Sequence, residues 1–323
     1  MRKRASFCCL AMVLLIGCST KGSPQARQTP SVSASASLAA TLSCRLPVIS
    51  PTSADDPPGG WITFPGGDFA RDPASLSGRL ISHVPSYDRA SRRWLPVESP
   101  YVAPDGASYI LHNDQSVGND FYLVDAKTGT RKFRLSGNGP PQAPGSWTIV
   151  KYASEGVYLW SAGMLTIPGL WLLDPQTGSV RLIDGSHYWS MVDGGAAWAL
   201  AQPGGAEAST YNAVYRLDLA SGQVSTWYEG KGNIRLLSPT PDAALLIATQ
   251  GAGYGPPGIL RGPNQLSPLE ISPDNPNVAA AYLTHPGVWL ALQGGGLALY
   301  ERGVSARILT RGPLIFNVAG GCW

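Results

Sequence analysis

The stretch LWLLDPQTGSVRLI, residues 170–183, decides the fold prediction for this chain. Two apolar, β-rich runs flank a turn that contains Asp174, Thr177 and Gly178. Glycine supplies the left-handed backbone that a tight hairpin with a bulge requires, and Asp and Thr side chains can bond turn amides. The same template occurs in FYLVDAKTGTRKFRL (121–135) and in VYRLDLASGQVSTWY (214–228). The motif is therefore interpreted as a hairpin connector and not as a binding site.

Weaker copies extend the series along the chain. They are SYDRASRRWLPV (86–97), GILRGPNQLSPLEI (258–271) and LALYERGVSARIL (297–309), so the marked turns recur at steps of 37 to 49 residues. A repeat of about 40 to 45 residues built only from strands is typical of propeller blades.

A second marker precedes each hairpin: a short apolar strand, a turn of small, acidic or Pro residues, and another apolar strand. It occurs as VAPDGASYIL (102–111), YASEGVYLW (152–160), MVDGGAAWAL (191–200), SPTPDAALLIA (238–248), LTHPGVWLAL (283–292) and NVAGGCW (317–323). These are expected to be the turns between the first and second strands of six blades. The last copy has no hairpin after it, so the ring is expected to close through the two ends of the chain. The closing blade would join a strand at 314–319 to strands around 61–65, 79–87 and 92–97.

The two markers together resemble the extracytoplasmic β-propellers of bacteria, of the TolB-like, YVTN and PQQ-repeat kinds, over roughly residues 60–323. The prediction is an all-β, six-bladed propeller closed by pairing of its N- and C-terminal strands, and uneven blade lengths leave seven blades as the alternative. The resemblance is specific for the fold. It implies little about function, because the shared motifs lie in structural turns.

The N-terminus predicts secretion. Three basic residues at positions 2–4 precede an apolar run at 7–16 that is too short to span a bilayer. The following Leu-Ile-Gly-Cys resembles the lipobox of bacterial lipoproteins, which implies that Cys18 is lipidated and becomes the mature N-terminus. We therefore expect a signal peptide at 1–17, a lipidated, Ser/Ala/Pro-rich tether at 18–43, and the propeller at 44–323.

Charge and cysteine content narrow the possibilities further. Removing residues 1–17 takes away three of the 24 basic residues and none of the 21 acidic ones, so the remaining chain is formally neutral and nucleic acid is not a predicted partner. Cys44 and Cys322, one at each end of the propeller, are predicted to form a disulfide outside the cytoplasm. Two free buried thiols are the alternative.

The sequence contains no convincing catalytic motif. Lys127 to Gly129 match a penicillin-binding-protein box, but neither Ser-x-x-Lys nor Ser-Asp-Asn accompanies them, and they lie in a hairpin connector. The four histidines, at 83, 112, 187 and 285, lack metal-ligand spacing. No catalytic residue, metal or cofactor is predicted.

The candidate ligand-binding residues lie on long loops and inner strands. Tyr211 and Tyr254 are on long loops of one face, and Lys151, Arg235 and Asn317 are polar residues of inner strands that could line the central channel.

The leading hypothesis is a non-catalytic, lipid-anchored binding or scaffold protein at the cell envelope. It would be held to the membrane by the lipid on Cys18, with an envelope protein, a peptide or a glycan as candidate partner. The alternative is a propeller enzyme, a lactonase-like hydrolase or a quinoprotein-like dehydrogenase, with calcium or a cofactor in its channel.

Overall fold

The computed structural model describes residues 42–50, 58–78, 84–112, 120–135, 146–162, 169–200, 212–230, 232–250, 256–271, 277–311 and 316–323. They belong to one compact unit, Thr41–Trp323. Among them, no helix is both long and apolar enough to cross a membrane. Tyr211, Tyr254, Cys18 and the signal-peptide region lie outside the described residues.

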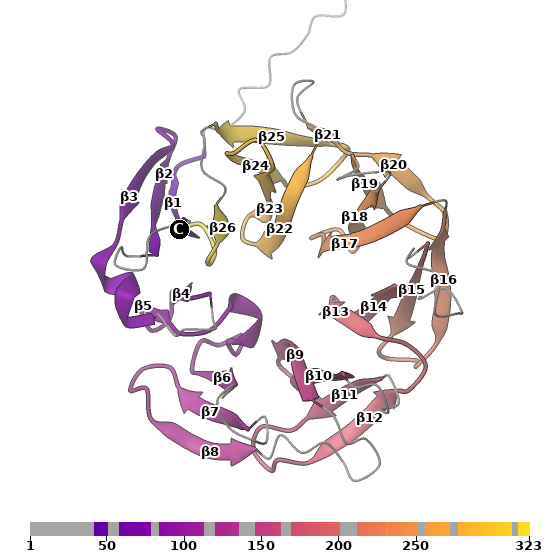
Figure 1. The fold of residues 1–323 in the computed structure, drawn as a ribbon, viewed down its shortest axis with the longest axis horizontal. Coiled ribbons are helices and arrows are strands. Elements are labelled where there is room, and N and C mark those ends of the chain that lie inside the picture. The colour runs from indigo at the N-terminus through magenta and orange to yellow at the C-terminus, as the bar shows by residue number, and fades with distance from the viewer. Residues whose placement is uncertain are drawn as a thin grey trace, which may run out of the picture. The chain divides into compact units, whose positions relative to one another are not determined.

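Six small antiparallel sheets form a ring, which makes the unit a six-bladed β-propeller (Figure 1). The fold prediction is therefore confirmed. The first blade, in spatial order, contains β26 (Asn317–Val318), β1 (Cys44–Ile49), β2 (Gly59–Phe64) and β3 (Asp68–Arg71). The second contains β6 (Ser108–His112), β7 (Phe121–Asp125) and β8 (Arg131–Leu135), and Val102 bridges to Tyr109 of β6 at its inner side.

The third to sixth blades follow one another along the chain. The third contains β9 (Ser146–Ala153), β10 (Gly156–Ala162), β11 (Leu170–Leu173) and β12 (Val180–Asp184). The fourth contains β13 (Trp189–Asp193), β14 (Ala196–Leu200), β15 (Ala213–Asp218) and β16 (Val224–Glu229). The fifth contains β17 (Asn233–Pro239), β18 (Leu245–Gln250), β19 (Pro257–Leu260) and β20 (Leu266–Pro268). The sixth contains β22 (Val278–Thr284), β23 (Gly287–Leu292), β24 (Leu297–Tyr300) and β25 (Ser305–Thr310), and β21 (Glu270–Ile271) pairs with β25 in parallel.

The Asp-x-x-Thr/Ser-Gly motif forms the turn between the two outer strands of its blade, as the sequence predicts. In the β11–β12 turn, Asp174 Oδ2 accepts a hydrogen bond of 2.7 Å from the Thr177 hydroxyl, and the Gly178 amide donates to the Asp174 carbonyl at 2.9 Å. Gly178 has φ +74°, a left-handed conformation that glycine adopts without steric cost. The turns at 125–129 and 218–222 repeat this pattern, with glycine φ values of +73° and +71°.

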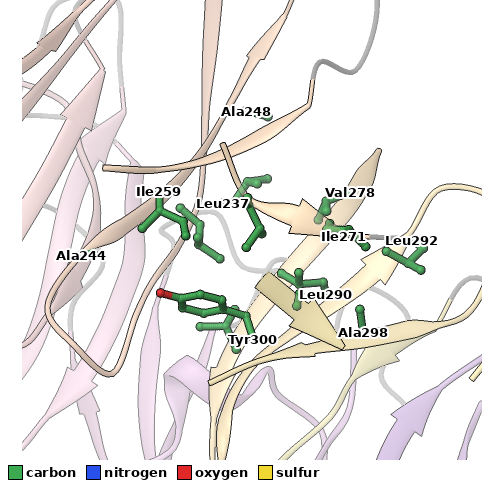
Figure 2. Close-up of a cluster of buried hydrophobic side chains, with 14 residues drawn as sticks. Leu237, Ala244, Ala248, Ile259, Ile271, Val278, Leu290, Leu292, Ala298 and Tyr300 are labelled. Atoms are coloured by element: carbon green, nitrogen blue, oxygen red, sulfur yellow. The ribbon is translucent and has the colours of Figure 1, made fainter. Parts of the chain in front are cut away.

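The core lies between the blades, because middle strands such as β23 bury both of their faces. All six residues of β23 are buried. Val288, Leu290 and Leu292 pack toward the fifth blade in the cluster shown in Figure 2, whereas Trp289 and Ala291 pack toward the first blade. Successive residues thus alternate between two neighbouring blades, which explains why these strands read as continuous apolar runs.

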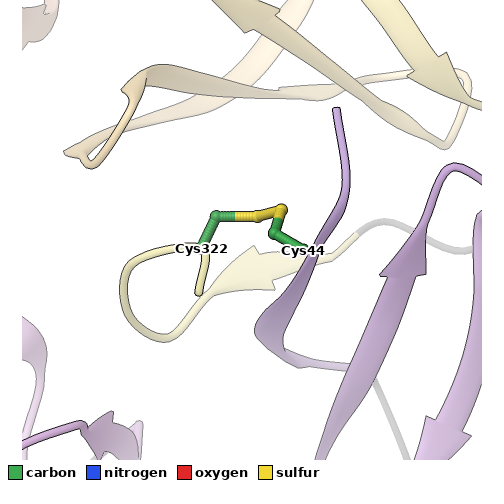
Figure 3. The surroundings of a disulfide bond; sticks show 2 residues. All are labelled: Cys44 and Cys322. Atoms are coloured by element: carbon green, nitrogen blue, oxygen red, sulfur yellow. A yellow bond between two sulfur atoms is a disulfide. The ribbon is translucent and has the colours of Figure 1, made fainter. Parts of the chain in front are cut away.

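The ring closes through its two chain ends. In the first blade, Val48 and Ile49 of β1 pair antiparallel with β26. The predicted disulfide between Cys44 and Cys322 is present (Figure 3), with 5.6 Å between the Cα atoms, a separation typical of disulfides.

The composition of the closing blade differs from the prediction. Residues 61–64 do contribute, within β2, but residues 84–87 and 92–97 do not; residues 79–83 lie outside the described residues. Instead, β4 (Ser86–Asp88) and β5 (Arg93–Leu95) pair with each other as a two-stranded sheet between the first two blades, and the Tyr87 amide of β4 donates to the Ala319 carbonyl at 2.7 Å. The strand that the sequence prediction omitted from this blade is β1, which lies between β26 and β2. Its Pro47 lacks a backbone donor, which argues against a strand when only the sequence is read.

Candidate functional site

The central channel contains a cavity of about 320 Å³. It is lined by residues from the inner strands of five blades and from the short 3₁₀ helix η2 (Ser99–Tyr101). The lining residues are Ser99, Pro100, Val150, Lys151, Ser190, Met191, Val192, Asp193, Leu237, Ser238, Pro239, Ala281, Tyr282, Leu283, Thr284, Val318 and Gly320. Most come from the later part of their strand, so the cavity lies at the end of the channel where the first-to-second strand turns are.

Lys151 and Asp193 are the charged residues of this lining, and they form an ion pair between β9 and β13. The side chains are 34% and 22% exposed, respectively. The two charges offset each other across the junction of the third and fourth blades. The cavity therefore has little net charge, which suits an apolar or neutral ligand.

Tyr282 joins the sixth blade to the closing strand. Its hydroxyl donates a hydrogen bond of 2.6 Å to Asn317 Oδ1 on β26. Burial raises the pKa of Tyr282 to about 12, and the Glu98 carboxylate adds to this effect. The phenol therefore stays protonated near neutral pH and remains a donor to Asn317.

Arg235 connects the fifth blade to the sixth. Its guanidinium donates to the backbone carbonyl of Ala279 at 2.9 Å and to that of Val278. These bonds satisfy carbonyl oxygens at the start of β22, away from the residues that line the cavity. Arg235 therefore links two neighbouring inner strands, β17 and β22.

The structure therefore separates the three inner-strand candidates. Lys151 lines the cavity, Asn317 contacts a residue that lines it, and Arg235 braces two blades. Asp193 and Tyr282 line the cavity and were not singled out from the sequence. Both fall at or beside the first-to-second strand marker, and the sequence pattern indicates only a turn at Asp193.

The oxygen ligands in the cavity do not fit a resident calcium ion. Calcium takes six to eight oxygen ligands, usually with several carboxylates. The described residues of the lining supply a single carboxylate, Asp193, which already contacts Lys151. Across the described ranges, no three His, Cys, Asp or Glu side chains cluster in a way that could hold a metal.

The chain is similar to some solved structures at low identity. No protein-family model and no curated protein matches it. TolB from Acinetobacter baumannii is 15% identical, over 87% of this chain and 65% of TolB, with a TM-score of 0.47. A putative 6-phosphogluconolactonase from Bacteroides fragilis is 12% identical, over 86% of this chain and 96% of that chain, with a TM-score of 0.44. The chain spans 65% of the length of TolB.

Proposed function

We propose that this protein is a non-catalytic, lipid-anchored β-propeller that binds a partner outside the cytoplasm. The observation that carries the proposal is the channel cavity, whose two charged side chains pair with each other. Its volume of about 320 Å³ is at the lower end of the range for small-molecule sites.

The lining of the cavity favours a partner segment with an apolar side chain. Met191, Val192, Leu237 and Leu283 supply apolar surface, and hydroxyl groups such as that of Ser190 can bond a peptide backbone. An extended peptide segment of an envelope protein fits this chemistry better than a strongly charged ligand, because the ion pair leaves little net charge to attract one.

The ion pair also supports a binding role over catalysis. A general acid or base must exchange its proton with a substrate, and the charged groups of the cavity are directed at each other. Breaking the pair to free one group would cost electrostatic energy in a partly buried site.

The N-terminal sequence supports the anchor. The basic start, the apolar run and the Leu-Ile-Gly-Cys box lead to Cys18, and 25 residues separate Cys18 from Cys44. A flexible segment of that length has an end-to-end distance of about 25 to 30 Å, which would hold the propeller close to the membrane.

The anchor is tested in bacterial cells supplied with an alkyne fatty acid. The full chain is expected to incorporate the label and to sediment with membranes, whereas a Cys18→Ser chain incorporates none. Equal labelling of the two chains would contradict lipidation at Cys18.

The binding role is tested by photo-crosslinking in the same cells. A crosslinking amino acid replaces Ser190 in the cavity or, as the control, Arg302 on an exposed turn. A discrete protein adduct at position 190 that is absent at position 302 is expected. Native mass spectrometry of the purified chain gives the opposing outcome: stoichiometric calcium or a retained cofactor, released by EDTA, would favour the propeller-enzyme alternative.

A further inference from the structure

A second cavity, of about 470 Å³, lies where the first blade meets the β4–β5 sheet and the C-terminal residue. We call it the arginine pocket because Arg45, Arg71, Arg92 and Arg93 line it, with Asp72 as the acidic side chain. These residues come from β1, β3 and the β4–β5 hairpin, so the pocket exists only in the closed ring.

The charge of the arginine pocket is unbalanced. The Asp72 carboxylate accepts hydrogen bonds from the indole nitrogens of Trp61 at 3.0 Å and Trp94 at 2.9 Å. It also accepts one from the Ala74 amide at 3.0 Å. Among the described residues that line the pocket, one carboxylate faces four guanidinium groups. An anion entering the pocket meets a net positive field.

Arg45 and Arg93 keep donor capacity for a ligand. The Arg93 Nη1 atom donates to the Lys127 carbonyl at 2.9 Å, and the Arg45 guanidinium lies over the Trp61 ring, 4.6 Å from its centroid. A guanidinium has five N–H donors, so these contacts leave others for an oxyanion. Arg45, Arg71 and Arg92 are exposed at the pocket.

Aromatic rings form the wall beside these charges. Trp323 is 40% exposed and stacks on Tyr87, with 5.9 Å between the ring centroids. Its backbone pairs with that of Arg45 by hydrogen bonds of 2.7 and 3.2 Å, one residue beyond the Cys44–Cys322 disulfide. The exposed indole face can pack against the organic part of a ligand.

We propose that the arginine pocket binds a ligand through a phosphate group. A phosphate monoester carries nearly two negative charges and three terminal oxygens, whereas a carboxylate carries one charge and two oxygens. The arginine pocket, with several guanidinium groups and one carboxylate, therefore matches a phosphate better than a carboxylate ligand. A guanidinium can also bond two phosphate oxygens at once in bidentate geometry.

The phosphate could come from a lipid headgroup or from a soluble ester. Arg45 is 27 residues from Cys18, so the headgroup source is within reach of a membrane and rests on the proposed lipid anchor. Phosphate recognition itself does not depend on that anchor.

The test uses the chain that begins at Ser19, which lacks the anchor but retains all the hydrophobic clusters of Thr41–Trp323. Binding is titrated by tryptophan fluorescence at constant ionic strength with inorganic phosphate and with glycerol 3-phosphate. In parallel, flotation is measured with vesicles of phosphatidylcholine alone or with added phosphatidic acid. Saturable binding to inorganic phosphate or glycerol 3-phosphate assigns a soluble ligand, and binding only to the phosphatidic acid vesicles assigns a headgroup.

The pocket variant is Arg71→Gln with Arg92→Gln. Its charge-matched control is Arg181→Gln with Arg302→Gln, at two exposed positions away from the pocket. The pocket variant is expected to bind at least tenfold more weakly with an unchanged urea midpoint, and the control to bind as the unsubstituted chain does. Equal weakening in both variants, or no saturable binding to any phosphate probe, would overturn the proposal. Neither result bears on crosslinking at Ser190, so the two proposals fail independently.

Discussion

Removing the Cys44–Cys322 disulfide is expected to lower the free energy of unfolding by several kcal/mol. The bond joins residues 278 positions apart in the sequence, so it closes nearly the whole propeller into one loop. For a loop of this length, the chain-entropy relation gives about 5 to 6 kcal/mol at 25 °C. Residual structure in the unfolded chain reduces this value, so a loss of about 3 to 5 kcal/mol is expected.

The measurement is urea unfolding followed by tryptophan fluorescence. In a chain that begins at Ser19, Cys44 and Cys322 are the two cysteines, so Cys44→Ala with Cys322→Ala removes the bond and leaves no free thiol. The slope of the unfolding free energy against urea should also increase, because the unfolded chain without the crosslink exposes more surface.

Reductant provides the matched control. It should shift the unsubstituted chain to the stability of the double variant and leave the variant unchanged. A difference below about 1 kcal/mol between the oxidised and substituted chains would refute the reasoning, since the crosslink would then add little to the closure that β26 and β1 already make.

Three further predictions concern single sites. Gly222→Ala should destabilise the protein by about 1 to 2 kcal/mol in urea unfolding, because the left-handed φ of +71° is strained for alanine. The added Cβ meets no atom within 4 Å, so the backbone conformation alone accounts for the loss. Unchanged stability would show that the turn does not need glycine. Asp193→Asn leaves Lys151 without its carboxylate, and a double-mutant cycle with Lys151→Met should give a coupling of about 1 kcal/mol, small because the pair is partly exposed; zero coupling would contradict the ion pair. The hydrogen bond from the Thr128 amide lowers the pKa of Asp125 from 3.8 to about 2. The stabilising contribution of the Asp125 carboxylate is therefore complete above about pH 4 and is lost as the pH falls through 2. An NMR titration of Asp125 with a midpoint near 3.8 would contradict this prediction.

Local patterns were enough to predict the blades and their turns. The Asp, Thr and Gly of the 174–178 turn interact within five residues, so their pattern determines the hairpin wherever it lies in the fold. The apolar runs of middle strands such as β23 predicted burial for the same reason, since each residue needs only a neighbouring blade on either side. The Cys44–Cys322 pairing was predicted from the secretion signal and the small number of cysteines.

The sites depended on contacts that the sequence does not display. The partners Lys151 and Asp193 are 42 residues apart, and Arg45 meets Trp323 only when the ring closes. The assignment of β1 to the closing blade likewise required knowing which strand edge β26 would meet. The sequence by itself determined the repeated unit, because turn and strand preferences act over a few residues. The tertiary structure decided the closure, the channel ion pair and the arginine pocket, because each of these joins side chains that only the closed ring brings together.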